Sequence, residues 1–300
     1  MSNHSLSNLT VIAGPTASGK SSIAIEIAKK SGAVIVNADS RQVYRELKIG
    51  SSQPVPDTIS EGNVWIIDGV KHFLYGHKSI NEVYTVVDYK DEVDNLLKQL
   101  GGIPILLVGG TGLFIESVIY NYKFTSADSS KLNPFSREYL ENLSVTDLQL
   151  LLTSETLDVM NESDKANKYR LIRAIERGGI PKAVKRPFKQ YFVLDPGREA
   201  VIQNIERRTE SLFTMGLLDE VQQLWNQYHP FTLNALKSIG YSEFIPYFNG
   251  ECTLQEVTEQ INLHTRQFAK RQRTWWRRNS DIKCFDQAEQ LKEAILSSEI

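Results

Sequence analysis

The spacing of Gly14, Gly19, Lys20 and Ser21 is typical of a phosphate-binding loop. The segment Gly14-Pro-Thr-Ala-Ser-Gly-Lys-Ser21 fits G-x-x-x-x-G-K-[ST] and stands between an expected strand and an expected helix. In such a loop, backbone N–H groups and the amino end of the helix attract an anion, and Lys20 adds a full charge. The hydroxyl of Ser21 is suited to hold Mg²⁺. The loop therefore predicts a di- or triphosphate ligand, without identifying ATP.

Two polar residues, Asp39 and Thr111, stand just beyond expected strands. Residues beyond the carboxyl ends of parallel strands face the ligand crevice of such a sheet. The Asp39 carboxylate can there orient a nucleophile or accept its proton, and the Thr111 hydroxyl can bind a base or a phosphate. Both residues are equally suited to cap a following helix, and position alone does not decide between these roles.

Positive charge is concentrated in two segments. Residues 165–189 hold nine Lys or Arg and one acid, and residues 264–278 hold six Lys or Arg and no acid. In the second segment a helix places four of the cations on one face: Arg266, Lys270, Arg273 and Arg277. Such a stripe favours a polyanionic partner such as nucleic acid, the alternative being a merely solvated face.

Two tryptophans lie within the second basic segment. Trp275 and Trp276 are suited to stack on bases or to pack in a core. We favour the core for Trp275, because it is in line with Ile261 and Phe268 at heptad spacing.

The surrounding pattern predicts an α/β fold. Apolar runs with β-branched residues predict strands at 9–13, 33–36, 103–108 and 190–194. Helices are predicted at 21–30, 88–100, from 112 to about 120, and at 145–152, 168–177, 198–213, 217–228 and 254–278. Strands that alternate with helices indicate a doubly wound parallel sheet. We therefore predict a core of residues 1–121 and 189–300, helical toward its carboxyl end, with an inserted helical subdomain at 122–188.

Composition limits the class of protein. The 300 residues are 41% hydrophobic with a net charge of −2, so bulk charge alone predicts no nucleic-acid partner. Cys252 and Cys284 are far apart in sequence and are expected to be free thiols. We find neither a signal peptide nor the roughly 20 apolar residues of a membrane span. We expect a monomeric, cytoplasmic protein with no membrane partner.

A series of motifs in order resembles the tRNA dimethylallyltransferase (isopentenyltransferase) family over nearly the whole chain. The most specific strings are the Pro-Thr-Ala interior of the phosphate-binding loop and Thr265-Arg-Gln-Phe-Ala-Lys-Arg-Gln272 followed by Thr274-Trp275. The other matches are Asp39-Ser40 with Tyr44, Ile49-Gly50 with Pro54, Leu107-Val-Gly-Gly-Thr-Gly-Leu-Phe114, Arg170-Leu-Ile-Arg-Ala-Ile-Glu176, and Ile239-Gly240-Tyr241 with Glu243.

The resemblance implies a P-loop NTPase-like core and a prenyl transfer. In this family a dimethylallyl group moves from dimethylallyl diphosphate to N6 of the adenosine at tRNA position 37, next to the anticodon. Mg²⁺ is the implied cofactor with Ser21 as its ligand, and tRNA, through its anticodon stem-loop, is the implied partner.

The family pattern also implies roles for individual residues. Asp39 and Thr111 would be catalytic. The diphosphate would be bound by Gly14, Pro15, Thr16, Ala17, Ser18, Gly19, Lys20, Ser21 and Arg208. The tRNA would be bound by Ser40, Arg41, Gln42, Val43, Arg170, Arg173, Gly240, Tyr241, Arg266, Gln267, Lys270, Arg271 and Arg273.

The chain departs from the family pattern at a few positions. Gln53 stands where lysine is usual, Phe114 replaces a tyrosine, and Tyr169 stands where glutamine is commoner. Residues 125–135 lack an expected arginine. No C-x-x-C or His-rich tail follows Trp276, which implies a bacterial form without a zinc finger.

Three alternatives fit parts of the sequence. A small-molecule P-loop kinase explains the loop and Asp39 but not the basic helix at 264–278. An adenylate prenyltransferase shares the loop, Asp39 and Thr111, but its free nucleotide acceptor needs no tRNA-binding surface. A non-catalytic RNA-binding module would bind tRNA without turnover.

Overall fold

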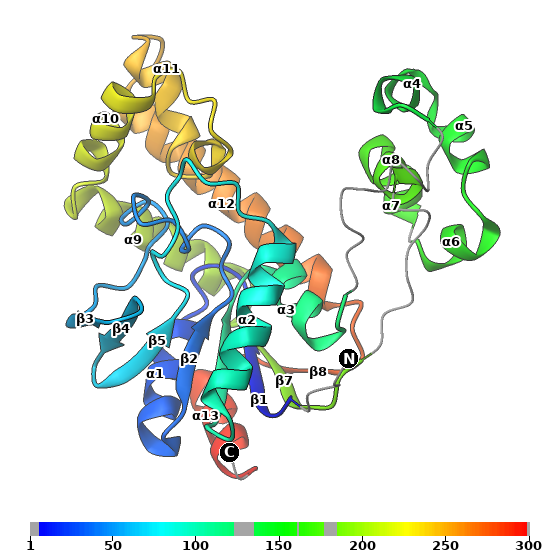
Figure 1. Cartoon of the computed structure of the whole chain (residues 1–300). Coiled ribbons are helices and arrows are strands. Elements are labelled where there is room, and N and C mark those ends of the chain that lie inside the picture. The colour runs from blue at the N-terminus through cyan, green and yellow to red at the C-terminus, as the bar shows by residue number, and fades with distance from the viewer. Residues whose placement is uncertain (1–5, 123–134, 161, 177–184, 299–300) are drawn as a thin grey trace. The chain divides into compact units, whose positions relative to one another are not determined.

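The computed structural model describes residues 6–122, 135–160, 162–176 and 185–298 and divides the chain into two compact units (Figure 1). The core unit comprises residues 1–119 and 186–300, and the inserted unit comprises residues 120–185. The predicted insertion, 122–188, differs by a few residues at each end. Arg186 belongs to the core because its N–H donates to the Ile119 carbonyl at 2.9 Å and its guanidinium forms an ion pair with Asp94.

The core unit is built on one eight-stranded sheet with the order β3-β4-β5-β2-β6-β1-β7-β8. The six strands from β5 to β8 in this order are parallel to one another, whereas β4 pairs in antiparallel fashion with both β3 and β5. The parallel strands are β5 (Val70–Phe73), β2 (Val34–Asn37), β6 (Ile105–Gly109), β1 (Leu6–Ala13), β7 (Phe188–Leu194) and β8 (Ile282–Phe285). The antiparallel ones are β3 (Thr58–Ser60) and β4 (Val64–Ile67). The fold class expected from the sequence, a P-loop NTPase-like parallel sheet, is confirmed.

Apolar runs form the centre of this sheet. Every residue of β2 and β6 is buried, as expected of strands that are covered on both faces. In register, Ile12 of β1 pairs with Val108 of β6, and Val36 of β2 pairs with Leu107 of β6. The carboxyl ends of β1, β6 and β2 therefore lie side by side, and these are the ends that carry the predicted chemistry.

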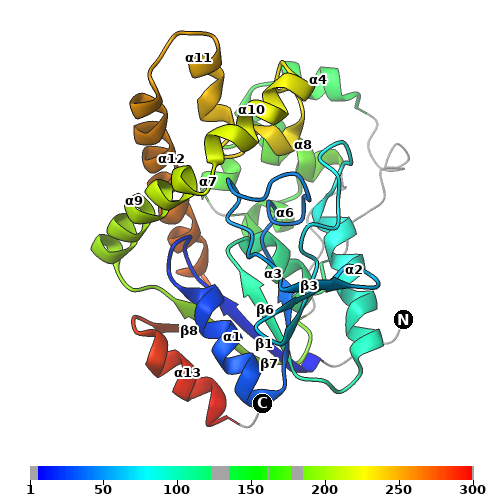
Figure 2. The same ribbon diagram turned by 90° about the vertical axis from the view of Figure 1, so that its left-hand side faces the viewer.

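Helices cover both faces of the sheet (Figure 2). On one face, α1 (Lys20–Ser31) and α13 (Ala288–Leu296) pack on β-strand residues in a core cluster that includes Ile12, Ile27 and Leu291. On the other face lie α2 (Val86–Leu100) and α3 (Gly112–Ile119). A capping box of Thr85 and Asp88 fixes the start of α2.

A second helical layer stands beyond the carboxyl end of the sheet. It contains α9 (Arg198–Thr214), α10 (Leu217–Tyr228), the 3₁₀ helices η2 (Asn234–Lys237) and η3 (Ser242–Phe244), α11 (Ile245–Phe248) and α12 (Leu254–Trp276). These helices enclose a separate apolar cluster around Leu217, Tyr241, Phe244 and Ile261, and Val43 and Leu47 from the loop after β2 join it. The predicted helical carboxyl-terminal region is confirmed, and it is anchored on the loop that carries Asp39.

The inserted unit has a small core of its own. Its helices are α4 (Arg137–Asn142), α5 (Val145–Leu150), α6 (Ser154–Val159), α7 (Glu162–Lys165) and α8 (Lys168–Glu176). Leu140, Leu148 and the apolar face of α8 pack together. The atypical segment at 125–135 lies outside the described residues apart from Phe135, and so do positions 177–184 of the first basic segment.

Residues 50–85 hold strands that we did not predict. The run Val64–Ile67, the pair Asp68-Gly69 and the run Val70–Phe73 form a tight hairpin. Asp68 and Gly69 have φ values of 54° and 78°, as a two-residue turn with positive φ at both positions requires. An Asp-Gly pair between apolar runs is the sequence signal for such a hairpin. Among the described residues, no helix is both long and apolar enough to span a bilayer.

Candidate active site

The phosphate-binding loop lies between β1 and α1, as the sequence predicts. Ala17 and Gly19 have positive φ values of 61° and 87°, which turn consecutive N–H groups toward one side. Gly14 has no room for a side chain, because a Cβ there would lie 2.4 Å from the Leu194 carbonyl oxygen of β7. The hydroxyl of Ser18 is buried and has no hydrogen-bond partner among the described residues. A buried polar atom without a partner is what a loop shaped for a phosphate would leave.

Arg208 of α9 reaches this loop from the second helical layer. Its Nη1 donates to the Thr16 hydroxyl at 2.6 Å and its Nε to the Ser52 hydroxyl at 2.7 Å. Burial lowers the pKa of Arg208, whereas Asp39 raises it. The pKa of Lys20 falls to about 8, chiefly through burial and also through Arg208, with Asp39 acting in the opposite direction. Two poorly solvated cations, Lys20 and Arg208, thus lie where the anion is expected to bind.

Asp39 and Thr111 lie in neighbouring loops, which follow β2 and β6. The Ser40 N–H donates to the Thr111 hydroxyl at 3.0 Å, and the Thr111 N–H donates to the Ala38 carbonyl at 3.0 Å. Asp39 Oδ1 accepts the Arg41 N–H at 2.9 Å, so this carboxylate stabilises a turn and caps no helix. Thr111 precedes α3 and accepts Phe114 N–H through its carbonyl, but its side chain faces Ser40. Neither side chain therefore caps a helix, which was the alternative role for both residues.

Asn37 fixes the backbone that presents Asp39. Its Oδ1 accepts the Asp39 N–H at 2.9 Å, and its Nδ2 donates to the Leu74 carbonyl at 3.0 Å. Tyr89 of α2 donates to the Asn37 carbonyl at 2.9 Å from a fully buried position. We did not predict a role for Asn37, since no sequence pattern marks a buried asparagine at a strand end.

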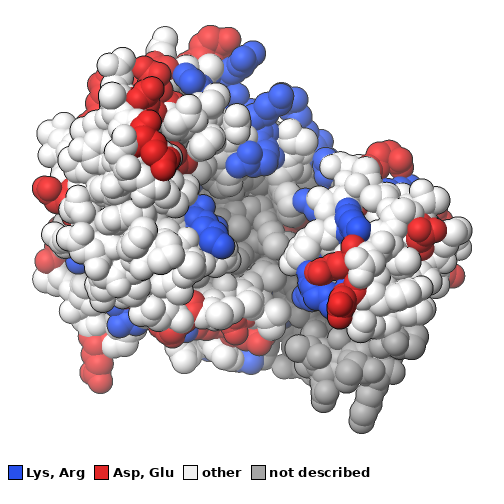
Figure 3. All heavy atoms as spheres, turned by 90° about the horizontal axis from the view of Figure 1, so that it is seen from above, with Lys and Arg blue, Asp and Glu red and all other residues white. Residues whose placement is uncertain are grey.

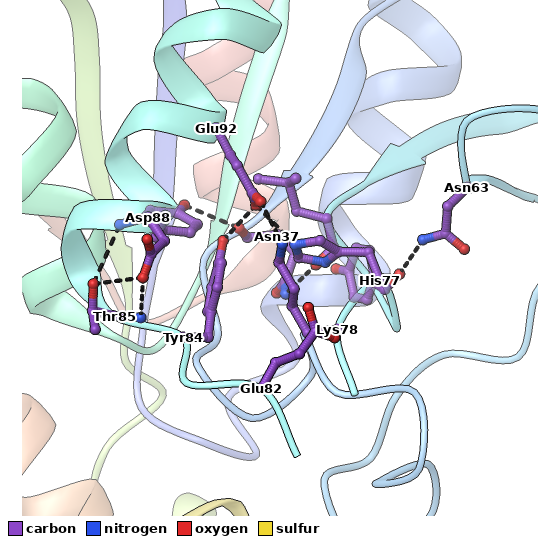
Figure 4. A network of polar contacts seen from close by, with 12 residues as sticks. Asn37, Asn63, His77, Lys78, Glu82, Tyr84, Thr85, Asp88 and Glu92 are labelled. Carbon is purple, nitrogen blue, oxygen red and sulfur yellow. Dashed lines mark hydrogen bonds and ion pairs between the residues drawn. The ribbon is translucent and has the colours of Figure 1, made fainter. Parts of the chain in front are cut away.

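A partly buried carboxylate of α2, that of Glu92, holds the neighbouring segment in place (Figure 4). Glu92 accepts hydrogen bonds from His77 at 2.8 Å, Lys78 at 2.8 Å and Tyr84 at 2.7 Å. Burial opposes the ionisation of Glu92, but these donors outweigh it and hold its pKa at about 2. Lys78 in turn pairs through its backbone with Val43 and Arg45. The network therefore helps to hold the loop after β2 in place.

A cavity of about 310 Å³ opens between the loop after β2 and helices α9 and α12. Thr16 and Arg208 line it where the phosphate-binding loop approaches, and Asp39 lines the same space. Its apolar wall consists of Ile205, Leu212, Ile239, Ile261 and Phe268. Arg41, Lys237 and Arg271 add positive charge to its lining. The cavity thus combines anion-binding groups, one carboxylate and an apolar wall.

Several predicted RNA contacts lie in or beside this cavity. Ser40, Arg41, Gly240 and Arg271 line it. Gln42 is partly buried, and its amide donates to the Ser51 and Ser52 carbonyls at 3.1 and 2.8 Å. The prediction is wrong for the side chains of Val43 and Tyr241, which are 0% exposed. Both belong to the apolar cluster of the second layer, and the Tyr241 hydroxyl donates to Glu220 at 2.8 Å.

The basic face of α12 is partly neutralised. Arg273, which we predicted to bind tRNA, lies in a two-point ion pair with Asp195. Arg266 pairs with Glu206 at 3.3 Å, whereas Gln267 and Lys270 are exposed. In the view of Figure 3, several Lys and Arg lie close together in the upper part of the core surface, with Asp and Glu at its upper and left edges.

The arginines of α8 lie in the inserted unit and have acidic neighbours. Arg170 pairs with Asp164, and Arg173 pairs with Glu176 at 2.7 Å. Both arginines remain partly exposed, so they keep guanidinium surface for a phosphate. Their predicted part in tRNA binding stays a prediction.

The apolar face of α12 differs from expectation. Trp276 is 3% exposed, whereas Trp275 is only partly buried and packs on Gly112. Phe268 and Ile261 both line the cavity, and Ile261 also belongs to the apolar cluster of the second layer. The same helical face continues to Gln272, a buried residue in contact with the phosphate-binding loop that we did not predict as functional. Its spacing of i+4 from Phe268 was the available signal.

The sequence is similar to those of known proteins over nearly its whole length. The family model described as IPP transferase matches residues 42–279. The tRNA dimethylallyltransferase of Trichormus variabilis is 37% identical, over 94% of this chain and 95% of that protein. That of Lachnoclostridium phytofermentans is 33% identical, over 91% of this chain and 90% of that protein.

Solved structures agree in fold. The full-length tRNA isopentenylpyrophosphate transferase of Bacillus halodurans matches with a TM-score of 0.67 and 26% identity, covering 97% of this chain and 96% of that one. A eukaryotic dimethylallyltransferase acting on tRNA matches with a TM-score of 0.74 at 22% identity, covering 96% of this chain and 76% of that one. With the family model spanning most of its length, the chain belongs to the IPP transferase family.

Proposed function

We propose that the protein transfers a dimethylallyl group from dimethylallyl diphosphate to N6 of the adenosine at tRNA position 37, releasing diphosphate. The observation that carries this proposal is the shared cavity of Asp39, Thr16 and Arg208. A prenyl diphosphate needs an anion site beside apolar surface, and an amino nucleophile needs a proton acceptor opposite the leaving group. The cavity lining supplies all three, and relatives that align over nearly the whole chain are named for this reaction.

In the proposed reaction the N–C bond to the prenyl carbon forms as the C–O bond to diphosphate breaks. Lys20, Arg208 and the loop N–H groups neutralise the departing diphosphate. Asp39 accepts a hydrogen bond from N6 and takes its proton. The adenine amino group is a weak nucleophile, so holding N6 and the diphosphate on opposite sides of the carbon is the principal contribution of the protein.

The residues at the loop fit the proposed Mg²⁺. Mg²⁺ keeps several waters and is usually bound by few protein groups together with substrate phosphates. Ser21, exposed at the start of α1, offers one hydroxyl, and no cluster of three acidic, His or Cys side chains suited to a metal occurs among the described residues. When bound with the diphosphate, the ion would neutralise charge on the leaving group.

The proposed acceptor is an adenosine of the tRNA anticodon loop. An adenine amino group is reached only when the base leaves its stack, which costs a few kcal/mol. Arg41, Lys237 and Arg271 give the cavity a cationic lining, which favours entry of a nucleotide. We further propose that the exposed cations of α12 and the inserted unit bind the tRNA backbone, and that the protein acts as a cytoplasmic monomer.

Incubation with unmodified tRNA, Mg²⁺ and labelled dimethylallyl diphosphate, followed by nucleoside analysis, tests the proposal. Label is expected in N6-prenylated adenosine from position 37, and Asp39→Asn is expected to abolish most of it. Parallel reactions offer AMP as acceptor and ATP as donor. Prenylation of AMP without tRNA would indicate a free-nucleotide enzyme, and steady phosphate transfer from ATP would indicate a kinase.

A further inference from the structure

Gln272 is a buried amide that joins two loops of the site. It lies on α12 and is 5% exposed. Its Oε1 accepts the N–H of Thr16 in the phosphate-binding loop at 2.8 Å, and its Nε2 donates to the Gly110 carbonyl at 2.8 Å. Both the oxygen and the nitrogen of the amide are therefore hydrogen-bonded. Their partners, Thr16 and Gly110, stand 256 and 162 residues away in sequence.

The sheet order explains why this link matters. The phosphate-binding loop follows β1 and Asp39 follows β2, with β6 between these strands. The loop after β6 is tied to the Asp39 side through the Thr111 hydroxyl, which accepts the Ser40 N–H at 3.0 Å. On its other side, Gln272 ties the Gly110 carbonyl to Thr16. The side-chain contacts of Thr111 and Gln272 thus connect the carboxylate to the anion site.

The surroundings admit a neutral amide and little else. A Cβ at Gly110 would lie 2.3 Å from Gln272 Nε2, so the loop approaches the amide as closely as a glycine allows. A carboxylate at position 272 would accept the hydrogen bond from the Thr16 N–H. Its second oxygen would face the Gly110 carbonyl oxygen, and the two would repel each other. An apolar side chain would leave both buried backbone groups without a partner.

We propose that Gln272 is a positioning residue, which sets the separation between the diphosphate and Asp39 during prenyl transfer. The proposal rests on the proposed function. Gln272 holds the two loops at one spacing, and this spacing determines how far N6 stands from the prenyl carbon. Misplacement of reacting groups by about 1 Å lowers rates by about 10²-fold. The loss should therefore fall on kcat more than on either KM.

The test uses the full-length protein and three variants. Gln272→Met keeps the length of the side chain and removes both hydrogen bonds. Gln255→Met, at an exposed position on the same helix, is the matched control. For Gln272→Met we expect kcat to fall about 30-fold or more, with the KM for tRNA and for dimethylallyl diphosphate within about threefold of the natural protein. Gln255→Met should behave as the natural protein.

Gln272→Glu separates positioning from a general loss of structure. A protonated glutamic acid can accept from Thr16 and donate to the Gly110 carbonyl, as glutamine does, whereas the carboxylate cannot. Burial beside a carbonyl favours the protonated form. The kcat of Gln272→Glu relative to the natural protein should rise as pH falls from about 8 to about 6, and that of Gln272→Met should not.

The outcomes distinguish the two proposals. A natural protein that transfers no prenyl group overturns the proposed function and the positioning role together. An active natural protein with a kcat for Gln272→Met within twofold overturns the positioning role alone. A kcat of Gln272→Glu that is as low as that of Gln272→Met at every pH from about 6 to about 8 also overturns it.

Discussion

The N–H of Ser40 donates a hydrogen bond to the hydroxyl of Thr111 at 3.0 Å, across 71 residues of sequence. This contact joins the loop after β2 to the loop after β6. Because Ser40 follows Asp39 directly, Thr111 limits where the carboxylate can stand in the cavity. Thr111 therefore influences the chemistry through the backbone of its neighbour, whereas Asp39 lines the cavity itself.

This arrangement predicts unequal effects at the two positions. Asp39→Asn keeps an oxygen for the Arg41 N–H but cannot take a proton, so kcat should fall about 10²-fold or more while tRNA still binds. Thr111→Ala should lower kcat less. Single-turnover prenylation and tRNA binding by filter retention measure both quantities, with Asp91→Asn on the exposed side of α2 as control. Unchanged turnover for Asp39→Asn would refute its role.

Arg208 and Arg207 form a matched pair on α9. Arg208 donates to Thr16 and Ser52 inside the site, whereas Arg207 is exposed and contacts Asn204. Arg208→Ala should raise the KM for dimethylallyl diphosphate by about 10- to 100-fold, since hydrogen bonds to charged groups contribute about 1.5–3 kcal/mol. Arg207→Ala should leave that KM within about twofold. Steady-state kinetics at saturating tRNA decide this, and equal KM values for the two variants would contradict the assignment.

The fold was more predictable than the site, for physical reasons. Apolar runs and the G-x-x-x-x-G-K-[ST] pattern are local, so the central strands and the phosphate-binding loop follow from neighbours in sequence. Val43 and Tyr241 were misassigned because burial depends on packing between distant segments, here the loop after β2 and the second helical layer. The ion pair of Arg273 with Asp195 was not predicted, because the two residues stand 78 positions apart in sequence. Asn37 acts through a buried amide that no charge or hydropathy pattern reveals, and for Gln272 the available signal was its i+4 spacing from Phe268.

The lowered pKa of Lys20 predicts a pH dependence of diphosphate binding. Burial, aided by Arg208, brings this pKa to about 8, so the ammonium is charged below pH 8 and increasingly neutral above it. A bound diphosphate would favour the charged form and raise the pKa. Affinity should therefore be constant well below pH 8 and decline above it. Calorimetry at pH 8 in buffers of different ionisation enthalpy should show that the protein takes up protons when the diphosphate binds. Lys20→Met should take up fewer protons.

The lowered pKa of Lys20 also affects how the stability of the protein depends on pH. The folded protein releases the Lys20 proton near pH 8, whereas the unfolded chain holds it to about pH 10.5. Between these values the unfolded state binds more protons, so this group makes the free energy of unfolding increase with pH. Denaturant titrations measure the free energy of unfolding at each pH. From pH 8 to pH 10 this free energy should increase less, or decrease more steeply, for Lys20→Met than for the natural protein. Identical slopes would contradict the lowered pKa.

Lys270 tests whether the remaining free charge of α12 binds RNA. This lysine is exposed, unlike Arg273, whose guanidinium is occupied by Asp195. Lys270→Gln should weaken tRNA binding and reduce the slope of log affinity against log salt by about 1, because one phosphate contact is lost. Lys71→Gln, exposed on β5, removes the same charge from another part of the core and should change neither quantity. If both substitutions reduce the slope equally, α12 has no special part in binding, and the attraction is a property of the net charge alone.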